Sequence, residues 1–115
     1  MHWTDIAQRQ AGTVTILDLQ GQMTLSGEEE ARLLRAIRQL ETAGSRQVLL
    51  NLSEVSYVDS TGIGEIVGAY TRVVRKGGML KLCGLSGRTQ ELLDTTNIGS
   101  VIESFANEAE ALESF

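Results

Sequence analysis

The chain has 115 residues and a net charge of −5 at pH 7, and 42% of its residues are hydrophobic. This size and apolar content suit one folded domain over residues 1–115 and argue against a disordered chain. The acidic balance argues against nucleic acid as a partner, because binding to a phosphate backbone requires a cluster of Lys and Arg. The apolar runs are too short to span a bilayer, and the first ten residues do not resemble a secretion signal. We therefore expect a cytoplasmic protein without direct membrane insertion.

The residues that usually carry catalysis or hold metals are scarce. His2 is the only histidine and Cys83 the only cysteine, so Ser-His and Cys-His arrangements and paired metal-ligand spacings are missing from the sequence. The sequence therefore predicts a protein that is not an enzyme and that has no metal site and no cofactor. Cys83 lies between Leu82 and Gly84 in a strand-like run, and we interpret it as a small buried residue.

The first half of the chain predicts a hairpin and a helix. Alternating apolar residues indicate strands over residues 3–9 and 13–20, with a turn at residues 10–12. Ser26 and Glu29 have the spacing of a capping box, and apolar residues then recur at helical spacing until Gly44. The charged residues in and before this helix predict an exposed face of mixed charge: Arg32, Arg35 and Arg38 with Glu28, Glu29, Glu30 and Glu41.

The second half alternates between strands and helices. A continuous apolar run over residues 48–52 indicates a strand that is covered on both faces. A helix should follow from about Gly62 to residues 77–78, then a strand over residues 79–83 and a shorter helix that begins at Ser86 and closes at residues 97–99. A last short strand is expected within residues 101–105, and Asn107 should cap a terminal helix. The sum is an α/β fold with a mixed sheet of about four to five strands and about four helices, packed mainly on one side.

The handover from the buried strand to the following helix carries the sequence Asp59-Ser60-Thr61-Gly62. Ligand and partner sites of such sheets gather where strands pass into helices. A helix start also offers unpaired backbone N–H groups and a partial positive charge, which suit a phosphate. The motif has two interpretations from its residues alone: a phosphoserine switch, or a hydroxyl that only caps the helix. Thr61 is better placed to cap the helix than to accept a phosphate.

The order and spacing of these segments resemble the STAS domain family, and within it the bacterial anti-sigma factor antagonists. The resemblance spans nearly the whole chain and is carried by residues 48–52 (VLLNL), 55–64 (VSYVDSTGIG), 81–85 (KLCGL) and 92–98 (LLDTTNI). It implies a binding module whose unphosphorylated form binds a serine-protein kinase that acts as anti-sigma factor. Phosphorylation by that kinase at Ser60, with Thr61 as the fallback acceptor, would switch the module off. The alternative is an accessory subunit of a membrane transporter or of a larger signalling assembly.

The resemblance also implies a partner-binding surface, made of Thr24, Asp59, Ser60, Thr61, Gly62, Ile63, Gly64 and Glu65. Asp59 could orient the Ser60 hydroxyl or satisfy nearby backbone N–H groups as a turn residue. Gly62 and Gly64 could admit a partner's backbone, permit an unusual backbone angle, or allow close packing of helix on sheet.

Two residues of this surface depart from the family pattern. The antagonists usually have Gly-Glu, a hydrophobic residue and Asp after the first long strand, whereas residues 21–24 here are GQMT, with Thr24 in place of the acid. Glu65 adds a charge that would face the partner, where many relatives carry an apolar residue. Both departures indicate an unusual kinase or another regulator as the partner.

Overall fold

The computed structural model describes residues 5–23 and 32–115, which form one five-stranded sheet against four helices. The strands lie in the order β1-β2-β3-β4-β5. They comprise β1 (Asp5–Ala11), β2 (Val14–Met23), β3 (Gln47–Val58), β4 (Met79–Cys83) and β5 (Ser104–Phe105). β1 pairs antiparallel with β2 and all other pairs are parallel, so the sheet is mixed, as predicted.

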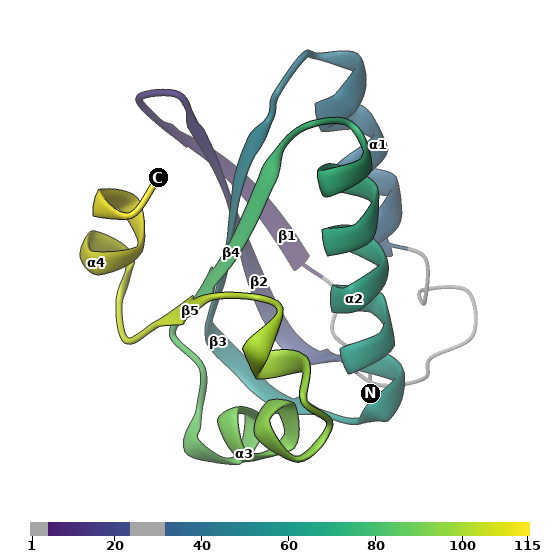
Figure 1. Cartoon of the computed structure of the whole chain (residues 1–115), viewed down its shortest axis with the longest axis vertical. Coiled ribbons are helices and arrows are strands. Elements are labelled where there is room, and N and C mark those ends of the chain that lie inside the picture. Colours follow the sequence, from purple (N-terminus) through teal and green to yellow (C-terminus); the bar gives the residue numbers. More distant parts are fainter. Residues whose placement is uncertain (1–4, 24–31) are drawn as a thin grey trace.

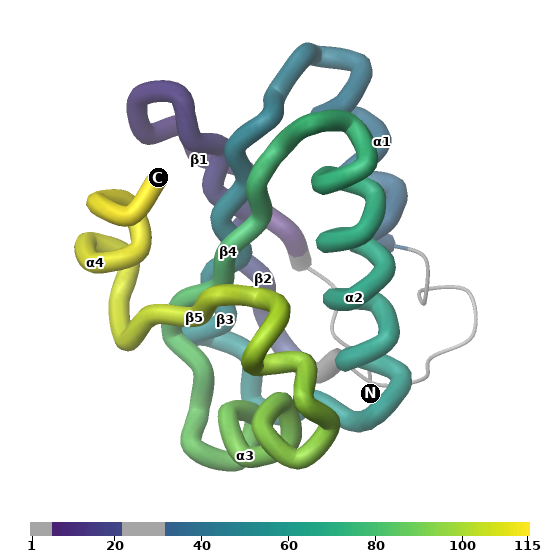
Figure 2. Tube along the Cα trace, in the orientation of Figure 1, coloured from purple at the N-terminus to yellow at the C-terminus, as the bar shows by residue number. Residues whose placement is uncertain are grey.

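The helices are distributed unequally over the two faces of this sheet (Figure 1). α1 (Arg32–Thr42) and α2 (Ser60–Arg75) lie side by side on one face, and α4 (Glu108–Glu113) covers part of the other face. α3 (Gly87–Thr95) lies at the end of the sheet where β3 and β4 finish, and the short 3₁₀ helix η2 (Ile98–Ser100) leads from it toward β5 (Figure 2). The predicted fold class is confirmed.

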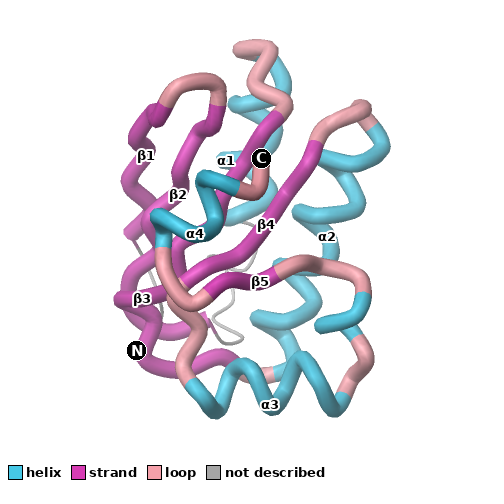
Figure 3. The backbone as a smooth tube through the Cα atoms, turned by 60° about the vertical axis from the view of Figure 1, so that its left-hand side comes forward, coloured by secondary structure: helices cyan, strands magenta, loops and turns pink. Residues whose placement is uncertain are grey.

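Two apolar layers hold the sheet between these helices. The larger layer lies under α1 and α2 and includes the fully buried Leu33, Ile37, Leu50, Ile66 and Leu82. α4 lies across the other face of the sheet (Figure 3). The smaller layer lies on that side and contains Val14, Ile16, Leu49, Cys83 and Ala111. Neighbouring residues of β3 therefore contribute to both layers, which explains why residues 48–52 are continuously apolar.

Several predicted boundaries shift in the structure. β3 continues six residues beyond Leu52, because β2 runs beside it as far as the pair Met23 and Val58, with two irregularities in the register. β1 extends to Ala11, two residues past its predicted end. The expected capping box at Ser26 and Glu29 lies outside the described residues, whereas Ser86 and Asn107 cap α3 and α4 as predicted.

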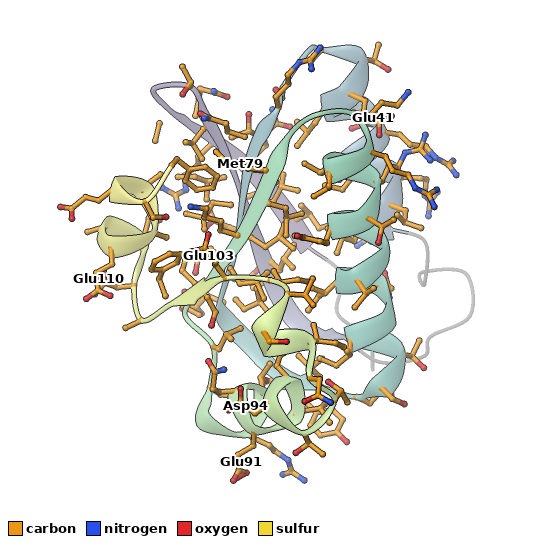
Figure 4. The ribbon with its side chains drawn as sticks, viewed as in Figure 1. Glu41, Met79, Glu91, Asp94, Glu103 and Glu110 are labelled. Carbon is orange, nitrogen blue, oxygen red and sulfur yellow. The ribbon has the colours of Figure 1, made fainter. Side chains whose placement is uncertain are left out.

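A buried lysine holds α4 on the sheet. Lys81 of β4 is 7% exposed, and its Nζ donates to the backbone O and Oγ of Ser114, at 2.7 Å and 3.0 Å. The same ammonium lies 3.1 Å from Glu103 Oε1 and 4.9 Å from the centre of the Phe115 ring (Figure 4 labels Glu103). Ion pairing and ring contacts thereby compensate for the removal of this charge from water.

A second ionic group connects β1, β2, β3 and α4. Arg9 Nη2 donates to Asp18 Oδ1 at 2.9 Å and to Glu108 Oε1 at 2.6 Å, and Asn51 Nδ2 donates to Asp18 Oδ1 at 2.8 Å. The hydrogen bond from Arg9 is the main cause that lowers the pKa of Asp18 below its ordinary value of 3.8, with a smaller effect from Asn51. The ionised carboxylate is therefore favoured by folding.

We expect Asp18→Asn to lower the free energy of unfolding by about 1 to 2 kcal/mol at pH 7. Because the pKa of Asp18 is lower in the folded state, its contribution is complete above the unfolded pKa and is lost as the pH falls through the folded one. The difference between wild type and variant should therefore shrink below about pH 4 in urea titrations. Glu91→Gln, at an exposed carboxylate, is the control and should show no such convergence. A difference for Asp18→Asn that persists unchanged at pH 2 would contradict this account.

The remaining expectations about single residues have mixed outcomes. Cys83 is 1% exposed, and burial is the main cause that raises the pKa of its thiol to about 11, so the buried interpretation is confirmed.

The charged face of α1 is only partly as predicted. Arg35 and Arg38 are exposed, but Glu41 forms an ion pair with Arg72 of α2 at 2.8 Å and thereby joins the two helices. Within residues 5–23 and 32–115, no helix has the length and apolar character needed to cross a membrane.

Candidate functional site

The carboxyl end of β3 passes directly into α2, and Asp59 is the residue between them. Asp59 has extended backbone angles (φ −105°, ψ −172°), and its Oδ1 accepts a hydrogen bond from the Gly62 N–H at 3.0 Å. Its carbonyl accepts the first helical bond, from the Ile63 N–H at 3.0 Å. Asp59 is therefore the N-cap of α2, which confirms the turn interpretation of this residue.

The prediction that Thr61 caps the helix is wrong, because Asp59 is the N-cap. The helix begins at Ser60, two residues before the predicted start, so Thr61 is inside the first turn and does not cap it. A carboxylate accepts the N–H of the third helical residue as well as a hydroxyl does, and Asp59 stands at the required position. Neither hydroxyl is therefore needed as the N-cap of α2.

Ser60 is consequently available for chemistry. Its side chain is exposed, whereas Thr61 is half-buried. Neither hydroxyl makes a hydrogen bond with any residue in the part of the chain that the structure describes. The first turn of α2 contains no acidic side chain. An anion attached to Ser60 would thus meet the positive end of a 16-residue helix without an acid inside that turn.

The two glycines of the motif differ in their surroundings. Gly62 is buried and helical, without a positive φ, so it is not required for an unusual backbone angle. Gly64 is exposed, and a Cβ at this position would meet no described atom within 4 Å apart from its chain neighbours and the nearby backbone of α2. Packing of the helix on the sheet therefore does not explain Gly64, and its bare backbone faces outward one turn from Ser60.

We expect Gly64→Ala to raise the free energy of unfolding by about 0.5 to 1 kcal/mol, because Ala favours a helix interior and the added methyl group meets nothing. Thermal and urea unfolding measure this change. Unchanged or reduced stability would show that a further contact constrains this position.

Besides Gly62, two further residues of the expected partner surface lie inside the protein. Ile63 is 4% exposed and Glu65 is 8% exposed, so the expectation that Glu65 faces outward is wrong. The helical period explains this result, because Glu65 lies four residues before the fully buried Ala69 and shares its face. The buried face of α2 is therefore wider than the spacing of its apolar residues indicated.

The end of β2 lies beside the motif, although Thr24 is outside the described residues. Met23 pairs with Val58, the residue before Asp59, and Gly21 pairs with Val55. The Ser56 hydroxyl donates to the Gly21 carbonyl at 3.1 Å. The GQM segment and the Asp59 turn are thus brought to one end of the sheet, as expected for the carboxyl ends of parallel strands.

The structure adds a pocket that the sequence did not indicate. Tyr57 is 40% exposed, and the Arg88 guanidinium of α3 lies over its ring at 5.6 Å from the centre. These two residues line a pocket of about 350 Å³ together with Val58, Asp59, Glu91, Leu92 and Thr95. Glu91 and Asp94 project from α3 at this end of the molecule (Figure 4). An exposed aromatic residue in a strand was the only signal, since no spacing predicts which helix packs beside it.

The described residues offer no metal site, because no three His, Cys, Asp or Glu side chains within them are grouped closely enough to hold an ion. The site consists instead of an exposed hydroxyl at a helix start, a bare glycine backbone and a neighbouring aromatic pocket. Its shape suits contact with another protein better than enclosure of a small substrate.

The chain matches a known domain family. A model of the STAS domain matches residues 5–111. The chain belongs to the STAS domain family. The anti-sigma F factor antagonist of Paenibacillus polymyxa is 30% identical over 93 residues, which cover 76% of this chain and 80% of that protein.

Two further comparisons concern a shorter stretch and the fold of the STAS domain. The anti-sigma-B factor antagonist of Bacillus subtilis is 46% identical over 52 residues, and this stretch is 45% of this chain and about half (48%) of that relative. The crystal structure of a Thermotoga maritima protein described as an anti-sigma factor antagonist superposes with a TM-score of 0.84 at 22% identity, covering 95% of this chain and 92% of the other. At that identity, the superposition supports the shared fold alone.

Proposed function

We propose that this STAS domain is an anti-sigma factor antagonist whose binding to a serine-protein kinase is controlled by phosphorylation of Ser60. The observation that carries the proposal is the exposed Ser60 hydroxyl at the first residue of α2, beside a cap that Asp59 already supplies. The domain acts by binding and is not itself an enzyme, and its proposed partner places it in the cytoplasm. The matched relatives named as antagonists support this assignment.

Phosphorylation at this position suits a switch that acts on the surface. A phosphoryl group adds about 1.5 to 2 negative charges, which the positive end of α2 stabilises. The cap bond between Asp59 and Gly62 does not involve the Ser60 side chain, so the helix start can persist after modification. A partner surface that fits the neutral hydroxyl would face a bulky anion. Binding would then be lost by repulsion and desolvation while the fold is retained.

The proposal is tested by incubating the domain with its cognate kinase and ATP and recording the intact mass. The wild type should gain one phosphoryl group, Ser60→Ala should gain none, and Thr61→Ala should behave as the wild type. Equal phosphorylation of wild type and Ser60→Ala would exclude Ser60 as the acceptor. Loss of the modification only in Thr61→Ala would transfer the role to the fallback residue.

A further inference from the structure

A groove separates α1 from the edge strand β1, on the face of the sheet that carries α1 and α2. Its volume is about 490 Å³. Its lining combines apolar and polar side chains, which are Ile6, Leu17 and Ala36 with Gln8, Gln39, Arg32 and Arg35. No acidic side chain lines it within residues 5–23 and 32–115. The charged side chains among its described lining residues are both arginines, in a protein with a net charge of −5.

The charge of this groove is available to a ligand through Arg35. Arg35 is exposed and makes no ion pair with any other residue in the described part of the chain. This contrasts with Arg9, which binds Asp18 and Glu108, and with Arg72, which binds Glu41. A guanidinium binds carboxylates through paired hydrogen bonds, so charge complementarity selects an acidic occupant.

The backbone beside the groove selects the conformation of that occupant. Among the described strands, β1 pairs with β2 alone and lies at the edge of the sheet (Figure 1). Its other edge therefore presents N–H and C=O groups that no described strand pairs. An extended segment can add to such an edge, with every second side chain on the same face at a spacing of about 7 Å. We propose that the α1–β1 groove binds an extended segment of a partner protein with acidic residues at alternate positions, which face Arg35.

The proposal is tested by fluorescence anisotropy with a labelled eight-residue peptide in which Thr and Glu alternate. A second peptide with Gln in place of Glu has the same length and β-propensity. The wild type should bind the Glu peptide about tenfold more tightly than the Gln peptide at low salt, and added salt should reduce the difference. Arg35→Ala should remove this preference. Arg38→Ala is the matched control, because Arg38 is exposed on the same helix but does not line the groove, and it should bind as the wild type does.

Other outcomes would overturn the assignment. Equal affinity of both peptides, equal binding by wild type and Arg35→Ala, or no binding of the Glu peptide at about 1 mM would each exclude an acidic occupant. A dimer in light scattering that Arg35→Ala dissociates would assign the groove to a second copy of the chain. Ser60→Asp should bind the Glu peptide normally, so the result is independent of the proposed phosphorylation switch. Circular dichroism confirms that each variant is folded.

Discussion

Ser60→Asp is expected to weaken binding of the partner by about a hundredfold or more while the domain remains folded. The substitution places a permanent carboxylate where phosphorylation would place a dianion. Its cost to stability should stay within about 1 kcal/mol, because an acid in the first helical turn interacts favourably with the helix dipole and Asp59 keeps its bond to Gly62. Binding is measured by biolayer interferometry with the kinase recovered by pull-down from the source organism.

Two control variants show whether the loss of binding requires a negative charge at residue 60. Ser60→Ala should bind as the wild type, since the hydroxyl makes no bond with the described residues that the fold requires. Ser100→Asp adds the same charge at an exposed residue of η2 and should leave affinity unchanged. If Ser60→Asp binds with wild-type affinity, the α2 start is not in the interface. If it unfolds, the residue has a structural role.

The local signals in the sequence determined most of the architecture. Caps at Ser86 and Asn107 and the strand Met79–Cys83 were predicted at the correct residues, because each depends on neighbours within a few positions. The site motif was also located correctly, since a strand-to-helix handover is visible as a change in apolar period. The roles of single residues in this motif were predicted less well, because Asp59 and not Thr61 caps α2. Ser, Thr and Asp are all good N-caps, and only the backbone shows which residue occupies the position.

The features that sequence could not predict arise from contacts between distant segments. β3 extends to Val58 because β2 lies beside it, although residues 53–58 are not continuously apolar. Arg88 joins Tyr57 at the site only because α3 folds under the end of β3. Lys81 looks like a solvent-facing residue of an alternating strand, yet α4 covers it and supplies Ser114 and Phe115 as partners. Each case depends on a tertiary neighbour that periodicity does not specify.

Gly78→Ala is expected to destabilise the domain by about 2 to 4 kcal/mol, the largest effect we predict for a single methyl group. A Cβ on Gly78 would lie 2.3 Å from the Arg46 carbonyl oxygen and 2.9 Å from Val73 Cγ1. The same carbonyl accepts the Met79 N–H at 2.8 Å, so it is fixed where β3 and β4 begin to pair. The methyl group must therefore separate β3 from β4 or displace the end of α2, and both movements open the main core.

The matched control for this change is Gly87→Ala. Gly87 is the first residue of α3, and a Cβ there would meet no described atom within 4 Å apart from its chain neighbours and the nearby helix backbone. Stability should therefore be unchanged or slightly higher. Gly78 does not have a positive φ, unlike Gly77, so backbone strain contributes nothing and the comparison isolates steric overlap. Urea unfolding gives the free energies, and the melting temperature of Gly78→Ala should fall by about 10 °C or more. Stability of Gly78→Ala within about 0.5 kcal/mol of wild type would mean that Arg46 can move without cost, and that the β3–β4 start is not rigidly packed.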